Sequence, residues 1–247
     1  MGISNGVNTI LILHGWGGSS RSWSKVKEIL EKQSFNVFTP DLPGFGTTPP
    51  PPEPWNVEKY AEWVKDFCEK QRLSQFFLLG HSFGGQIATR FATTYPVMLQ
   101  GLIFCSSVSI RIKPNLKAKI IIFLAKFGNA VFAPKILARF KDSARNLFYS
   151  FLRNRDYVKA NAIMKETMKN VLAEDLSQEL SKISAKTLLI WGAKDKLVPK
   201  QQAYIFKNNI KNSEIEILQG IGHSPHLECP GKLAEIIINF CAKFNKL

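Results

Sequence analysis

The sequence has few of the features that mark secreted, metal-binding or membrane-spanning proteins. It has only four cysteines, none in a C-x-x-C pair or at metal-ligand spacing, so we expect no metal and a reducing, cytoplasmic location. The sequence also shows no site for an organic cofactor, and we expect none. No basic segment followed by an apolar stretch opens the chain, and no signal peptide is expected. The most apolar run, Ile120 to Phe132, is interrupted by Lys126 and is too short to span a bilayer.

Acidic residues are also scarce. The chain has 19 Asp+Glu against 33 Lys+Arg, a formal net charge of +14, and residues 110–186 alone hold 16 of the basic and 6 of the acidic residues. Runs of charged residues usually form only the solvent-exposed faces of helices. A weak contact of this basic segment with an anionic membrane surface is the alternative. The sequence has no aromatic-basic RNA motif and no helix-turn-helix signal, so we expect no nucleic-acid partner.

Short apolar runs alternate with segments of helical periodicity through most of the 247 residues. This alternation predicts an α/β fold with a mostly parallel central sheet and helices on both faces. The predicted strands are Thr9–Leu13, Asn36–Thr39, Phe76–Leu79, Leu99–Cys105, Thr187–Trp191 and Glu214–Leu218. The helices predicted between and after them are Ser22–Gln33, Asn56–Arg72, Gly84–Tyr95, one from Lys200, and Gly231–Phe244.

The alternation stops between Ser107 and Ile183, where the pattern is helical only. We therefore predict a helical cap at residues 110–183, inserted into a core formed by residues 1–109 and 184–247. The helices predicted in this stretch are Asn115–Phe127, Ala133–Leu152, Asp156–Leu172 and a short one at Ser177–Ile183.

A nucleophile motif follows the third predicted strand. Gly80-His81-Ser82-Phe83-Gly84 matches G-x-S-x-G between an apolar strand and a helix start, which is the context that this motif requires. The turn from strand to helix is so tight that only glycine fits beside the serine, at Gly80 and Gly84. Ser82 is therefore the predicted nucleophile, and the side chain of His81 is expected to point away from the reaction.

A serine nucleophile needs a base, and the base needs a carboxylate to orient it. His223 lies in a loop after the last predicted strand, between the small Gly222 and Ser224, and is the preferred base; His226 is the alternative. Asp195 follows the strand Thr187–Trp191, so it is expected at the same edge of the sheet.

Two backbone N–H groups are expected to form an oxyanion hole. One is that of Phe83, directly after the nucleophile, and the other is that of Trp16 in the loop after the first strand. Glycines such as Gly15 let this loop approach a substrate closely, although a tight turn alone would need the same residues. His14 opens the loop.

These motifs together resemble the α/β-hydrolase fold family over nearly the whole chain. The stretches HGWGG, DLPGFG, GHSFGG, LLIWGAKD and GIGHSPHLE stand in the family's order, with the basic helical block between the third and fourth. The chain looks most like small, esterase-like members whose helical cap covers an acyl or alkyl pocket. Epoxide hydrolases and haloalkane dehalogenases of this fold resemble one another in using an aspartate nucleophile. Because the residue at this position is Ser82, we do not expect either of those activities.

The expected function is cleavage of a small-molecule carboxylic ester through a Ser82–His223–Asp195 triad and an acyl-enzyme. An apolar acyl group is expected because residues 120–127 are rich in isoleucine and phenylalanine. Hydrolysis of carbon–carbon bonds, lactones or thioesters on the same triad stays open, as does a receptor-like member that only binds its ligand. The sequence does not indicate the oligomeric state.

Overall fold

The structure is a computed structural model that describes residues 8–110 and 162–244. All described residues belong to one compact unit of the chain, and the fold below is that of this unit. The helices predicted at Asn115–Phe127 and Ala133–Leu152, and the start of Asp156–Leu172, lie outside the described residues. The cap boundaries at 110 and 183 therefore stay a prediction.

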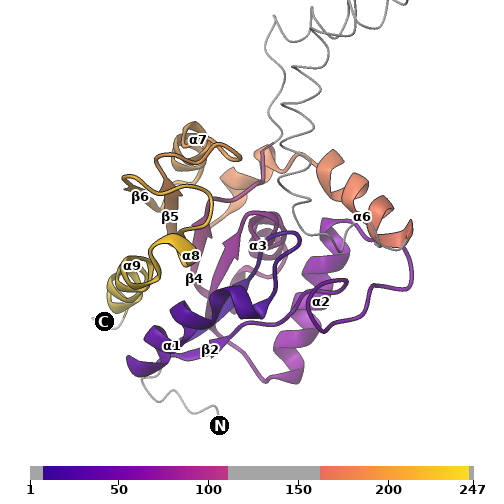
Figure 1. Cartoon of the computed structure of the whole chain (residues 1–247), viewed down its shortest axis with the longest axis horizontal. Helices are drawn as coiled ribbons and strands as arrows, with labels where there is room; N and C mark the ends of the chain where they lie inside the picture. Colours follow the sequence, from indigo (N-terminus) through magenta and orange to yellow (C-terminus); the bar gives the residue numbers. More distant parts are fainter. Residues whose placement is uncertain (1–7, 111–161, 245–247) are drawn as a thin grey trace, which may run out of the picture. The chain divides into compact units, whose positions relative to one another are not determined.

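Six strands form one sheet in the order β2-β1-β3-β4-β5-β6 (Figure 1). Each of the five strand pairings is parallel, so the predicted mostly parallel sheet is parallel throughout its described strands. Every predicted strand is present, with ends that differ by no more than two residues. Their bounds are β1 Thr9–Leu13, β2 Asn36–Phe38, β3 Phe76–His81, β4 Leu99–Cys105, β5 Thr187–Gly192 and β6 Ser213–Leu218.

The predicted helices within the described ranges are also present, with one change of type and with short additions at η1, η2 and α8. Residues Ser177–Lys182 form a 3₁₀ helix, η4, and the four-residue helix α8, Pro225–Glu228, was not predicted because it is too short to show a periodicity. The other helices are η1 Ser20–Trp23, α1 Ser24–Lys32, α2 Val57–Lys70, α3 Phe83–Thr94, η2 Pro96–Met98, α6 Ala162–Ala173, α7 Gln201–Asn209 and α9 Pro230–Ala242. None of the described helices is long and apolar enough to cross a membrane.

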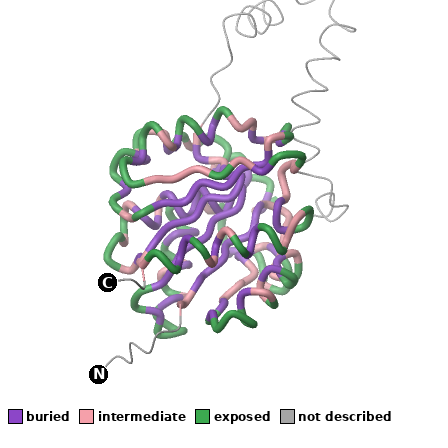
Figure 2. Tube along the Cα trace, turned by 90° about the vertical axis from the view of Figure 1, so that its left-hand side faces the viewer, coloured by how far each residue is buried: buried purple, intermediate pink, exposed green. Residues whose placement is uncertain are grey.

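Helices cover both faces of the sheet because alternate strand residues point to opposite sides. Phe77 and Leu79 of β3 belong to a buried cluster that includes residues of α1 and α9. On the other face, aromatic rings join the sheet to α3 and α7: Phe76 packs on Phe91, and Phe104 packs on Phe206. Figure 2 shows the result, with buried strands in purple inside helices whose outer sides are exposed.

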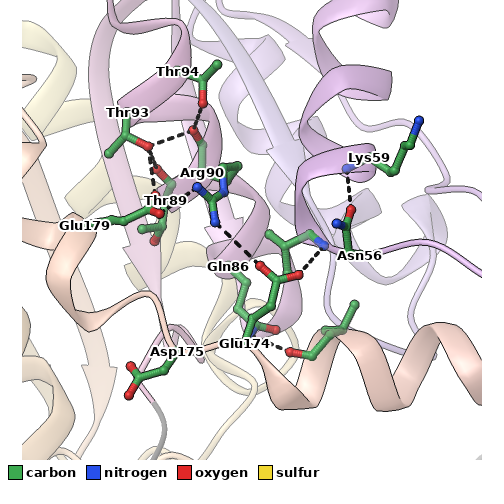
Figure 3. A network of polar contacts seen from close by, with 12 residues as sticks. Asn56, Lys59, Gln86, Thr89, Arg90, Thr93, Thr94, Glu174, Asp175 and Glu179 are labelled. Carbon is green, nitrogen blue, oxygen red and sulfur yellow. Dashed lines mark hydrogen bonds and ion pairs between the residues drawn. The ribbon is translucent and has the colours of Figure 1, made fainter.

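Polar contacts tie α6 and η4 to α2 and α3 (Figure 3). Arg90 of α3 forms ion pairs with Glu179 at 2.6 Å and with Glu174 at 3.6 Å. Glu174 also accepts a hydrogen bond from the backbone N–H of Val57, the first residue of α2. The segment that returns after residue 161 is thus anchored to the helix that begins directly after Ser82.

Candidate active site

The turn from β3 into α3 presents Ser82 at the carboxyl edge of the sheet. Ser82 has φ 52° and ψ −114°, a backbone conformation that non-glycine residues adopt rarely and at a cost. Its N–H donates to the carbonyl of Cys105 at 3.2 Å, and its own carbonyl accepts from Gly85 and Val108. Bonds to the neighbouring strand β4 and the loop after it therefore hold the strained turn in place.

The glycines on either side of Ser82 are required by close backbone contacts. A Cβ atom on Gly80 would overlap the carbonyl of Gly84, and a Cβ on Gly84 would overlap the carbonyl of Leu13 at the end of β1. The turn is thus packed against itself and against the neighbouring strand, and no side chain fits at either position.

Gly80→Ala and Gly84→Ala are each expected to lower the free energy of unfolding by about 1–3 kcal/mol, because overpacking forces the backbone apart. Urea denaturation measures the effect. Gly231→Ala in α9 is the matched control, since its added Cβ meets nothing within 4 Å. Alanine there should leave stability unchanged or raise it slightly. Equal stability of all three variants would contradict the tight turn.

His223 and Asp195 form a continuous chain of hydrogen bonds with Ser82. His223 Nε2 lies 3.1 Å from Ser82 Oγ, and His223 Nδ1 lies 2.8 Å from Asp195 Oδ2. The other carboxylate oxygen, Oδ1, accepts the N–H groups of Leu197 and Val198 at 2.9 and 2.8 Å. The buried carboxylate thus accepts the Nδ1 proton, which leaves Nε2 of the neutral ring able to accept the hydroxyl proton of Ser82.

The loop after β1 runs beside Ser82. A Cβ built on Gly15 would lie 3.1 Å from Ser82 Cβ. The N–H of Gly18 closes a turn on the carbonyl of Gly15 at 3.0 Å, with Gly17 at φ 71°. The N–H of Trp16 takes no part in that turn bond, and the N–H of Phe83 stands in the first turn of α3, where backbone donors have no partner within the helix. The loop that contains Trp16 thus lies close to Ser82, the residue directly before Phe83, and the oxyanion role of the two amides stays a prediction.

His14 holds this loop against the segment after β2. The N–H of Leu42 donates to His14 Nε2 at 3.0 Å, so Nδ1 carries the ring proton and donates to the carbonyl of Gly15 at 2.8 Å. Burial lowers the pKa of His14, against the opposing effects of Gly15 and Asp41, and the neutral ring suits both bonds. His14 is a structural link between two loops.

His81 and His226 lie behind the loop that carries His223. His81 Nε2 lies 3.0 Å from the backbone carbonyl of His223 and donates to it. His226 stacks on Trp23, with ring centroids 4.4 Å apart and planes 6° from parallel. Burial and the neighbouring His223 lower the pKa of His226 to about 3, and burial lowers the pKa of His81 well below its usual value. The hydrogen bond to the Ser82 hydroxyl is made by His223.

Aromatic side chains pack around the turn that carries Ser82, on the side of α2. The ring of Trp16 lies 5.2 Å from that of Phe83 and 4.9 Å from that of Phe45, and Tyr60 lies 5.1 Å from Phe83. We call Trp16, Phe45, Tyr60 and Phe83 the aromatic wall. Tyr60 and Phe83 are fully buried, Phe45 is nearly so, and Trp16 is the partly exposed member of the wall.

The sequence model of the alpha/beta hydrolase fold matches residues 8–230. The chain belongs to the α/β-hydrolase fold family. It is 28% identical to the pimeloyl-[acyl-carrier protein] methyl ester esterase of Aeromonas hydrophila, over 94% of each chain. It is 25% identical to human monoacylglycerol lipase, over 95% of this chain and 75% of the lipase. A bacterial membrane phospholipase A shares its fold with a TM-score of 0.75, at 24% identity over 99% of this chain and 81% of that one.

The sequence analysis of this α/β-hydrolase did not predict two groups of residues at the site. The aromatic wall includes Phe45 and Tyr60, and the carboxylate of Glu228 contacts the loop around His223. Phe45 had a usable signal, because its loop follows a strand and so reaches the same sheet edge as Ser82. Glu228 had none, because no pattern of spacing identifies a side chain that folds back on its own loop.

The cysteines of the α/β-hydrolase are free thiols at positions 68, 105, 229 and 241. Burial raises the pKa of Cys68 to about 12, so this thiol stays protonated at neutral pH. Within residues 8–110 and 162–244, no three His, Cys, Asp or Glu side chains are grouped so as to hold a metal ion.

Proposed function

We propose that this α/β-hydrolase cleaves carboxylic esters by two-step acyl transfer on Ser82. The observation that carries the proposal is the chain of hydrogen bonds from Ser82 Oγ through His223 to the buried Asp195 carboxylate. A hydroxyl is a weak nucleophile until an adjacent base removes its proton, and the Nε2 atom of His223 is placed to do so.

In the first step Ser82 Oγ attacks the ester carbonyl while its proton passes to His223 Nε2. The Asp195 carboxylate stabilises the resulting imidazolium, and the N–H groups of Trp16 and Phe83 bind the oxyanion. His223 then gives the proton to the leaving alcohol, which departs as the acyl-enzyme forms. In the second step His223 takes a proton from water as the water oxygen attacks the acyl-enzyme carbonyl. The bond to Ser82 Oγ then breaks, His223 returns its proton to that oxygen, and the carboxylic acid and free Ser82 result.

An apolar acyl group is the second part of the proposal. Trp16, the partly exposed ring of the aromatic wall, directly follows Gly15, whose backbone lies close to Ser82, and burial of a hydrocarbon chain against such a ring is favourable. The names of two relatives point the same way, since one is a methyl ester esterase and the other a monoacylglycerol lipase. Carbon–carbon, lactone and thioester hydrolysis use the same machinery and are alternatives that the experiment separates.

The test is hydrolysis of chromogenic acyl esters of increasing chain length. We expect kcat/KM to rise by about fourfold for each methylene that the wall buries, up to the length that it covers. Phe45→Ala should flatten this rise while leaving the shortest ester nearly unaffected, because Phe45 belongs to the wall and not to the hydrogen-bond chain.

Three results would count against parts of the proposal. A preference for hydrophilic acyl groups would contradict the apolar site. Turnover of lactones, thioesters or vinylogous diketones without turnover of esters would mean that the substrate is not a carboxylic ester. Saturable ligand binding without any turnover would replace hydrolysis with a receptor role.

A further inference from the structure

The loop that carries His223 is fixed by hydrogen bonds from three directions. The carbonyl of Ile221 accepts the N–H of Lys194 at 2.8 Å, which joins this loop to the turn that carries Asp195. The carbonyl of His223 accepts from His81 Nε2 at 3.0 Å. The third set of bonds comes from Glu228, and it alone holds the amides on both sides of His223.

The two oxygens of the Glu228 carboxylate are divided between these amides. Oε2 accepts the N–H of Gly222 at 2.8 Å, and Oε1 accepts the N–H of Ser224 at 3.0 Å. Gly222 and Ser224 are the residues directly before and after His223. The carboxylate therefore bridges the backbone across the residue whose ring must face Ser82.

The short helix α8 brings Glu228 back onto the loop. The N–H groups of Leu227 and Glu228 both donate to the carbonyl of Ser224 at 2.9 Å, and Pro225 begins the helix. The approach is close, since a Cβ on Gly222 would lie 3.1 Å from Glu228 Oε1. Four residues of helix thus return the carboxylate to its own loop.

We propose that Glu228 is a positioning residue for the base His223, an inference that rests on the proposed function of His223. It acts through the backbone and touches neither substrate nor Ser82. The ring of His223 must meet Ser82 Oγ and Asp195 Oδ2 at once, and a small displacement of a catalytic group can cost about 100-fold in rate. A bridge across the amides on either side of His223 limits rotation of the segment that carries the ring.

Position 228 requires a carboxylate, because the N–H groups of Gly222 and Ser224 are both donors and the side chain must accept two hydrogen bonds. Glutamine offers one acceptor and places an NH₂ group against the other N–H. Alanine offers none and leaves both amides to water. The order of activity that follows is wild type, then Glu228→Gln, then Glu228→Ala.

The test measures kcat and KM for an ester whose turnover depends on Ser82. We expect Glu228→Ala to lower kcat by about 10- to 100-fold with KM within about twofold, and Glu228→Gln to fall between Ala and wild type. Glu235→Gln is the matched control, since it removes the same charge from an exposed side chain on α9 that pairs with Lys232. It should behave as wild type.

A second measurement separates positioning from a loss of folding and does not need turnover. The proton between His223 Nδ1 and Asp195 gives a low-field NMR resonance, assigned by its loss in His223→Gln. We expect this resonance in wild type and Glu235→Gln, and its shift or disappearance in Glu228→Ala at a temperature where thermal melts show the variant folded.

The inference is overturned if Glu228→Ala keeps the resonance of wild type, whether or not its turnover falls. It is also overturned if only the melting temperature drops while kcat per folded molecule is unchanged. If ester turnover is absent or survives Ser82→Ala, the proposed function fails instead, and the response of the resonance still decides the role of Glu228.

Discussion

Ser82→Ala and His223→Ala are each expected to lower kcat by about 10⁴-fold or more, and the double variant should be no worse than either single one. The reason is that the two side chains act as one unit. Without the hydroxyl no acyl-enzyme forms, and without the ring 3.1 Å away the hydroxyl keeps its proton. Steady-state rates on the best ester of the panel, with titration of active sites by a serine-directed fluorophosphonate, measure the loss.

Two variants serve as controls for this result. Ser181→Ala removes an exposed serine hydroxyl in η4, which bonds only locally to the carbonyl of Gln178, and should leave kcat unchanged. His226→Gln tests the alternative base, and we expect its kcat to stay within a few-fold of wild type at a temperature where it is folded. Additive losses in the double variant would mean that Ser82 and His223 do not act in one step.

The folded protein is expected to lose stability as the pH falls from about 6.5 toward 3. Burial lowers the pKa of His14 and of His81, and burial and His223 lower that of His226 to about 3. In this pH range the unfolded chain binds protons that the folded protein does not, so the free energy of unfolding rises with pH. The contribution of each histidine is fully present above its unfolded pKa near 6.5 and is reduced by up to about 1.4 kcal/mol per pH unit below it.

Urea denaturation between pH 7.5 and 5 tests this expectation. The urea midpoint of the wild type should fall steadily below pH 6.5. His226→Gln should be less stable overall, but its free energy of unfolding should fall less steeply with pH, because unfolding takes up about one proton fewer. The titration of Asp41 does not contribute to the change in stability between pH 7.5 and 5. Despite partial burial, hydrogen bonds from Ser20 and Thr47 lower its pKa, so its contribution is lost only at more acidic pH. A midpoint that does not change down to pH 5 would mean that the histidines are protonated in the folded state.

Local patterns were enough to predict most of the fold. A strand such as β1 was recognisable from five successive apolar or β-branched residues, and α2 from its apolar spacing. The side chain of Asn56 caps this helix by accepting the N–H of Lys59 at 2.9 Å. The glycines at 80 and 84 pointed to the tight turn because their role depends only on immediate backbone geometry. Helix α8 was missed because a single turn has no period.

The sequence by itself therefore determined the strands and helices, the family and the candidate residues for the site, since each depends on residues close together in the chain. The tertiary structure decided which of these meet. His223 lies 28 residues from Asp195 and 141 from Ser82, and only the order of strands in the sheet brings their loops together. His226, three residues further on, stacks on Trp23 instead. The aromatic wall and the bridge made by Glu228 likewise exist only in three dimensions, because side-chain direction depends on packing that no local pattern records.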